Sequence, residues 1–338
     1  MLDRIKAKLH LDSDEHSQVP PQSCQTPAVN PAHLFPIPTS LSEYLDSDEP
    51  SQVPAQSCQT PAVNPAHLFP IPVLTGFSTH PICPIPNVCT TPLTDKSLGI
   101  QKSTPGFSRR TVCIDGQDSF EASYPEGSIN PQGTIKGGFG CYLEREDFER
   151  AKDVVFSYSI KFEDGFDFVK GGKLPGLYGG STPELAYGCS GGRQDGRDKC
   201  FSLRLMWRPK GAGEIYAYIP NTPANHEALE NVPPKTHCNP DFGWSVARGS
   251  FCFKPGEWTT IAERVRLNDV GCANGVLQLW ANGELVVDIQ GLEIRVDPDV
   301  VFRGAHFQTF FGGKAQDWAS TKDQCAFFGA VSGGIVEW

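Results

Sequence analysis

Short apolar or alternating runs, separated by Gly, Asn and Asp, fill the chain from about residue 110 onward, which is the pattern of an all-β sandwich. The apolar positions predict strands over residues 154–162, 201–208, 214–220, 258–267, 276–280, 285–289 and 305–311. Asn282 and Gly283 predict a type I′ hairpin turn, because both residue types tolerate positive φ. One stretch, 144–152, predicts a short helical turn. The fold class is therefore all-β, and we expect a double-sheet jelly roll over residues 111–338.

Residues 1–110 have a different texture, rich in proline, and they contain a tandem repeat. Residues 11–38 recur as 45–72, a period of 34, and the copies differ only at His16/Pro50 and Pro21/Ala55. Such a period is also found in helical repeats, but prolines at this density remove helix donors. We expect 1–110 to be a disordered tail, whose repeat is a duplicated linker or an artefact of the gene model.

Twelve Cys among 338 residues are too many for a typical cytosolic protein without a metal, and the chain has no C-x-x-C pair. Disulfides are the better interpretation and suggest secretion, although no apolar run follows the basic N-terminus as in a signal peptide. Eight of the Cys lie in 111–338, and the pairs Cys189–Cys200 and Cys238–Cys252 are expected because each would close one loop. The chain has no run of about 20 apolar residues, so we expect no membrane partner.

The formal charge of −10 argues against a general nucleic-acid binder. The charge is unevenly distributed, because residues 170–210 carry a net +5 while the rest of 111–338 carries −13. A basic loop that balances acidic neighbours is one explanation. A site for an anionic ligand is the other.

Strand geometry favours the anionic site. In the strand 201–208, Ser202, Arg204 and Met206 share one face, and the wholly apolar opposite face must point to the core. A turn centred near Gly211 predicts that Arg204 lies opposite Tyr218, and Met206 opposite Tyr216. Any even register keeps both tyrosines on the face of Arg204. The group is a candidate sugar site, with simple cross-strand stabilisation as the alternative.

At these residues the chain resembles polysaccharide lyase family 14, jelly-roll lyases of algal viruses, molluscs and fungi that cut alginate or related polyuronates. The resemblance runs from about Val154 to Trp338 and is densest in four blocks that follow in the family's order: 165–180, 201–208, 216–218 and 307–313. It implies that the functional residues are Lys173, Ser202, Arg204, Tyr216 and Tyr218. It also implies a local disulfide between Cys189 and Cys200.

The implied reaction, β-elimination, removes the C5 proton of a uronate and expels the oxygen at C4. Arg204 and Lys173 are suited to the carboxylate, and a tyrosine beside cations can act as base and acid, because cations favour phenolate. We expect Tyr218 in this role, shared with Tyr216 or Lys173. Ser202 would hydrogen-bond the substrate.

Three further residues are candidates for substrate binding: Lys170, Gln308 and His306. His306 and Gln308 share a face of the strand 305–311, and although His306 could be a general base, a structural or solvated role is expected. The segment 195–199 predicts a solvated loop rather than a metal site, and we expect no metal and no cofactor.

A polyuronate lyase, monomeric and with an anionic polysaccharide as its partner, is the leading hypothesis. The main rival is a jelly-roll protein that binds such a polysaccharide without cleaving it. An interaction protein that recruits partners through its Pro-rich repeats is a third possibility.

Overall fold

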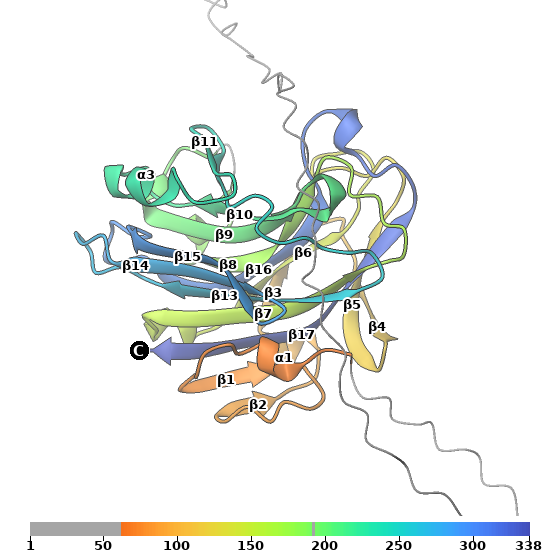
Figure 1. Ribbon diagram of the computed structural model, residues 1–338, viewed down its shortest axis with the longest axis horizontal. Coiled ribbons are helices and arrows are strands. Elements are labelled where there is room, and N and C mark those ends of the chain that lie inside the picture. Colours follow the sequence, from red (N-terminus) through yellow and green to blue (C-terminus); the bar gives the residue numbers. More distant parts are fainter. Residues whose placement is uncertain (1–61, 191–192) are drawn as a thin grey trace, which may run out of the picture. The chain divides into compact units, whose positions relative to one another are not determined.

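The computed structural model describes residues 62–190 and 193–338, and within them the chain forms two sheets that pack face to face, with sheet B above sheet A in Figure 1. Sheet A runs in the order β15-β14-β13-β7-β17-β1-β2, and β5 joins it beside β17 and carries β4. Its strands are β1 (Thr75–Ser78), β2 (Val88–Thr90), β4 (Arg110–Ile114), β5 (Gln117–Tyr124), β7 (Asp153–Phe162), β13 (Trp258–Arg266), β14 (Gly275–Ala281), β15 (Glu284–Leu292) and β17 (Gln324–Glu337).

Sheet B runs in the order β11-β12-β10-β9-β8-β16-β6-β3. Its strands are β3 (Ile100–Ser103), β6 (Phe139–Glu144), β8 (Gly172–Gly180), β9 (Cys200–Trp207), β10 (Gly213–Tyr218), β11 (His237–Asn239), β12 (Gly243–Val246) and β16 (Val301–Phe311). The predicted all-β jelly-roll sandwich is confirmed, and each predicted strand corresponds to an observed one.

Helices in the described residues are short and lie in connections. The α-helices are α1 (Asp95–Leu98), α2 (Pro183–Ala186) and α3 (Pro223–Leu229), and the 3₁₀ turns are η1 (Pro65–His67), η2 (Phe148–Arg150), η3 (Arg197–Lys199), η4 (Pro209–Gly211) and η5 (Gln316–Trp318). The predicted helical turn within 144–152 corresponds to η2. Among the described residues, no helix is long and apolar enough to span a bilayer.

The core fills the space between the sheets, where alternate residues of each strand meet. Phe201, Leu203, Leu205 and Trp207 of β9 are all fully buried in it, as their apolar face predicts. Tyr158 of β7 contributes from the opposite sheet. Because this face of β9 is committed to the core, Ser202 and Arg204 lie on the outward face of sheet B.

The boundary predicted at residue 110 is too late, because residues before it belong to the sandwich. Strand β1 pairs with β17, the last strand in the sequence, and β3 pairs with β6. The prolines between these elements interrupt the alternation, which hid strands of three or four residues. Residues 1–61 of the tail that is predicted to be disordered lie outside the described residues.

The end of the second repeat copy is packed rather than linker-like. Val63, Leu68 and Phe69 are buried against the outer face of sheet A, in a second apolar cluster with Val155 and Trp280. The Ser157 hydroxyl donates to the carbonyl of Leu68 over 2.5 Å. The prolines of this segment suit its role, since an extended segment that lies across a sheet needs no helix donors.

Two turns test the sequence predictions directly. Asn282 and Gly283 have φ of 51° and 82°, so the predicted left-handed turn between β14 and β15 is confirmed. The β9–β10 register was predicted wrongly by two residues, because Arg204 faces Tyr216 and Ser202 faces Tyr218. The turn is centred on Lys210, which adopts φ of 61°, rather than on Gly211.

Candidate active site

Four neighbouring strands bring the predicted site residues together on the outward face of sheet B. Tyr216 on β10 faces Arg204 on β9, and Arg204 faces Gly176 on β8, which in turn faces His306 on β16. Two residues along the strands, Tyr218 faces Ser202 and Ser202 faces Tyr178. Because the observed register differs from the predicted one by two residues, an even number, both tyrosines still lie on the predicted face.

Lys173 reaches this face through a bulge in β8. Its neighbour on β9 is Met206, while Gly176 is the neighbour of Arg204, so β8 uses three steps where β9 uses two. The Lys173 Nζ lies 3.4 Å from the ring centroid of Tyr216 and 5.6 Å from that of Tyr218. This is cation–π geometry within a cluster of buried groups.

Both cations of the site are buried. Lys173 is 8% exposed and Arg204 is 3% exposed. Burial, reinforced by Arg204 and Arg208, holds the pKa of Lys173 well below its ordinary value, and burial also lowers the pKa of Arg204. Among the described residues neither forms an ion pair with a carboxylate. Arg204 Nη1 instead donates to Gln308 Oε1 over 2.8 Å.

Several polar atoms on this face are buried without a hydrogen-bond partner: Lys173 Nζ, Ser202 Oγ, Arg204 Nε, His306 Nε2 and the Tyr178 hydroxyl. Each such group costs about 1–3 kcal/mol when it is left unsatisfied. Five of them on adjoining strands are expected where a polar ligand supplies the missing acceptors and donors. The two cations make an anionic ligand the best match.

The tyrosine pair is closely packed, with ring centroids 5.4 Å apart. A hydrogen bond links the Tyr216 and Tyr218 side chains and lowers the pKa of Tyr216, but burial is the larger effect and raises it. The expectation that nearby cations favour phenolate therefore fails for Tyr216 in the free protein. Desolvation of the phenolate outweighs the attraction of Arg208.

His306 is buried and stacked on this face of the sheet. It is 4% exposed, its ring stacks on Tyr142 at 4.2 Å, and burial together with Arg204 and Lys173 holds its pKa well below the ordinary value. The stacking favours a structural role, whereas the Nε2 without a partner favours contact with substrate, so the role of His306 stays a prediction. Gln308 orients Arg204, as described above.

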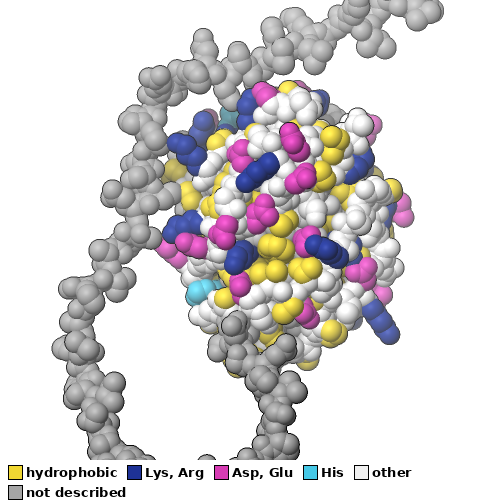
Figure 2. Space-filling view, turned by 90° about the vertical axis from the view of Figure 1, so that its right-hand side faces the viewer, with side chains coloured by type: hydrophobic (Ala, Val, Ile, Leu, Met, Phe, Trp, Pro, Cys, Tyr) yellow, Lys and Arg dark blue, Asp and Glu magenta, His cyan; other side chains and the backbone are white. Residues whose placement is uncertain are grey.

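Lys170 does not join the site. Its ammonium forms an ion pair with Asp317 at an exposed position, on the connection between β16 and β17. Arg208 is likewise committed to a carboxylate, since it pairs with buried Glu214 over 2.6 Å. Two cations of the predicted positive segment are thus paired with carboxylates, whereas buried Lys173 and Arg204 have no carboxylate partner among the described residues. On the face shown in Figure 2, charges of both signs are interspersed.

One predicted disulfide is present and the other is not. Cys189 and Cys200 are joined, and they pack against Tyr218 and Tyr216. No disulfide joins Cys238 to Cys252. Cys238 lies two strands away from Ala217 on β10, whereas Cys252 pairs with Ala212, about 16 Å further along that strand.

Sequence reasoning missed the second layer of this site. Tyr142 lies outside the four blocks, and Tyr178 lies within the block 165–180 but was not singled out there. The pairing of β6, β8 and β16 brings both to His306. Glu214 could have been found, because its position two residues before Tyr216 places it on the same face. Its role as the partner of two arginines could not.

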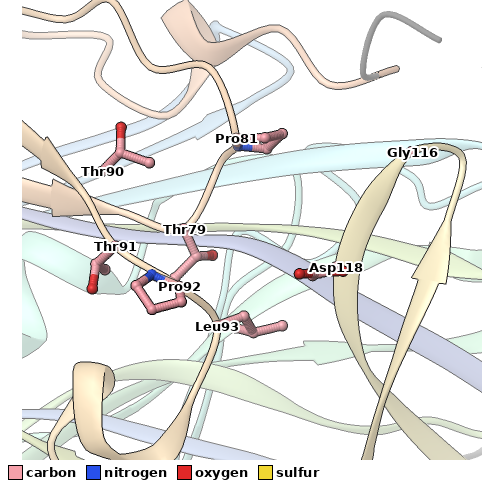
Figure 3. A pocket seen from close by; sticks show the side chains of 8 residues that line it. All are labelled: Thr79, Pro81, Thr90, Thr91, Pro92, Leu93, Gly116 and Asp118. Carbon is pink, nitrogen blue, oxygen red and sulfur yellow. The ribbon is translucent and has the colours of Figure 1, made fainter. Parts of the chain in front are cut away.

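A cavity elsewhere, of about 300 Å³, is unrelated to these residues. It lies between the β1–β2 region and the β4–β5 hairpin, and Figure 3 shows Asp118 and Leu93 among its lining side chains. Asp118 is its one charged lining residue, so the cavity has no cation for an acidic ligand.

The model of the family Polysaccharide lyase 14 matches residues 114–331. The chain belongs to polysaccharide lyase family 14. The match begins earlier than the resemblance predicted from about Val154 and also takes in β5 and β6. The protein is therefore a polysaccharide lyase.

Two solved structures place this family 14 lyase among its relatives. The PL-14 alginate lyase from Aplysia kurodai is 30% identical, with a TM-score of 0.62, over 71% of this chain and 92% of the other. The alginate lyase vAL-1 from Chlorella virus is 21% identical, with a TM-score of 0.58, over 71% and 93%. No curated protein matches the sequence.

Proposed function

We propose that this lyase cleaves a uronic-acid polysaccharide by β-elimination at the face that carries Lys173, Arg204, Tyr216 and Tyr218. The observation that carries the proposal is the pair of buried cations without a carboxylate partner among the described residues, beside two tyrosines. A neutral sugar would leave both charges unpaired. A uronate carboxylate would pair with them.

Substrate binding begins with the carboxylate. Arg204 Nε and Lys173 Nζ are the donors without partners, and Gln308 holds the guanidinium from its other side. An anion at this point raises the pKa of Lys173 again, so the ammonium form returns when substrate binds. Ser202, whose hydroxyl also lacks a partner, binds a sugar oxygen.

The chemical step needs a base at C5 and an acid at O4. Tyr218, as phenolate, takes the C5 proton; the electrons of that C–H bond form the C4=C5 double bond, and the C4–O4 bond breaks. The leaving oxygen takes a proton from a tyrosine. Burial favours the phenol form of Tyr216, which suits Tyr216 to donate this proton to O4. Tyr218, protonated by the substrate, then passes its proton to Tyr216 through the hydrogen bond between them, which restores the starting arrangement. Arg204 and Lys173 stabilise the charge that develops on the carboxylate.

Alginate is the substrate we test first, because the Aplysia kurodai relative at 30% identity is an alginate lyase. Glucuronan, which is also a 4-linked polyuronate, is the second. Both present the C5 proton and the carboxylate that the mechanism requires.

The test is to incubate the protein with alginate, glucuronan and carboxyl-reduced alginate and to follow the ultraviolet absorbance of the unsaturated product. We expect product from at least one polyuronate and none from the reduced polymer. The Tyr218→Phe variant should lose at least about 1,000-fold in kcat. Full activity of this variant would refute the assignment of the base.

The rival function is binding without cleavage. It predicts that alginate binds with no unsaturated product under any condition. It also predicts that Tyr218→Phe and the wild type behave alike, since binding needs no proton transfer.

A further inference from the structure

The bulge in β8 decides which way Lys173 points. In a regular strand, residues three positions apart lie on opposite faces. Lys173 and Gly176 nevertheless share the site face, and Leu174 and Leu177 are both fully buried in the core. The partner strand β16 also changes register here, with four steps between His306 and Phe310 against three on β8. Without the bulge, Lys173 would face the core.

Two backbone groups beside the bulge find their partners in the other sheet. The amide of Leu177 donates to Glu263 Oε2 on β13 over 2.9 Å. The Tyr158 hydroxyl on β7 donates to the carbonyl of Pro175 over 3.3 Å. A bulge leaves ladder groups unpaired, and these two contacts replace the missing ones across the core.

Glu263 is an unexpected residue for its position. It is 1% exposed and lies between Ile261 and Val265, which are fully buried in the core. Its Oε1 has no hydrogen-bond partner, and burial raises its pKa to about 8. An apolar residue of similar volume would avoid this desolvation. The contact that offsets this cost among the described residues is the hydrogen bond that Glu263 accepts from the Leu177 amide, beside the bulge.

We propose that Glu263 is a positioning residue, which fixes the β8 bulge through the Leu177 amide and thereby holds Lys173 against Tyr216 and beside Arg204. The inference rests on the proposed function of Lys173. Tyr158 acts in the same way, at the other end of the bulge.

The test compares Glu263→Leu, Glu263→Gln and the control Val265→Ala. Glu263→Leu has no acceptor for the Leu177 amide, so kcat should fall by about 100-fold, the effect expected for a misplaced catalytic group. Glu263→Gln keeps an acceptor oxygen and should restore kcat to within about 3-fold of wild type. Val265→Ala opens a cavity on the same face of β13 and should lower stability while leaving kcat unchanged.

A second readout does not depend on activity. Exchange of the Leu177 amide hydrogen, followed by NMR, should be about 10-fold faster in Glu263→Leu and unchanged in Glu263→Gln. Wild-type kcat in a folded Glu263→Leu variant, or unchanged Leu177 exchange, would overturn the inference.

Should Glu263→Leu fail to fold, Tyr158→Phe removes only the hydroxyl that holds Pro175. It should lower kcat and accelerate Leu177 exchange, and wild-type values of both would overturn the inference. If the wild type cleaves no polyuronate, the proposed function fails. The exchange experiment then still decides whether Glu263 anchors the bulge.

Discussion

Two clusters of buried charge lie next to each other on sheet B, and they are built in opposite ways. Glu214 is fully buried and accepts from Arg208, Arg248 and Ser245, each at 2.6–2.7 Å. Lys173 and Arg204 are also buried, and they have no carboxylate partner among the described residues. The first cluster is complete in itself, whereas we propose that substrate completes the second. Burial alone therefore does not distinguish a structural charge from a functional one. The ion-pair and hydrogen-bond partners of the charged group do.

The largest effect is expected on the incomplete cluster. Lys173→Met should lower kcat/KM on a polyuronate by at least about 1,000-fold, because it removes a buried cation that faces the substrate carboxylate. The free energy of unfolding, measured in urea, should be unchanged or higher, since the substitution removes a buried amine that has no hydrogen-bond partner among the described residues. A large loss of stability would show that Lys173 belongs to the structural cluster.

The complete cluster should respond in the reverse sense. Glu214→Gln leaves Arg208 buried beside a neutral group and should lower the free energy of unfolding by about 3–5 kcal/mol. The activity of the molecules that remain folded, assayed at low temperature, should stay within a few-fold of wild type. Loss of activity with unchanged stability would contradict the contrast between the two clusters.

Glu263 is a third case, a carboxyl buried with neither cation nor substrate. Its pKa of about 8 in the fold exceeds the ordinary value of 4.5, so the fold disfavours its ionised form. Stability from this group is fully present below about pH 4.5 and is lost as the pH rises through 8, by an amount on the order of 5 kcal/mol. The melting temperature of the wild type should fall between pH 6 and 9, relative to that of Glu263→Gln. Parallel curves for the two proteins would show that Glu263 does not titrate in this range.

The smallest effect is expected in the repeat, away from the Glu214 cluster, the Lys173–Arg204 cluster and Glu263. Deleting residues 39–72 joins Pro38 to Val73, so that Val29, Leu34 and Phe35 replace the identical Val63, Leu68 and Phe69. Melting temperature and kcat should both match the full chain. A lower melting temperature would indicate that the copies differ in what they contribute.

Alternation was enough to predict the strands and the faces of their side chains, because a strand buried on one side must alternate. Ser202, Arg204, Tyr216 and Tyr218 were therefore placed on one face from sequence alone. The register was not predictable, since it depended on Lys210 adopting a left-handed conformation that glycine usually takes.

Contacts between the two sheets could not be predicted from the sequence for another reason. The link between Glu263 and Leu177 joins residues 86 positions apart in different sheets, and no local pattern encodes which strand lies above which. The short strands before residue 110 were hidden by prolines, and the residues of the second repeat copy that reach the fold had no alternation to reveal them. Burial of Lys173, Ser202 and Arg204 on the outward face of sheet B also went unpredicted.

Strand β17 pairs with β1, β5 and β7, which lie far earlier in the sequence. During synthesis these three strands emerge well before residues 324–337 and have no partner on that side until the last strand leaves the ribosome. Sheet A therefore closes only after residues 324–337 have been synthesised, and its exposed edges must be protected until then. Truncations within β17 should consequently yield insoluble chains rather than a smaller active lyase.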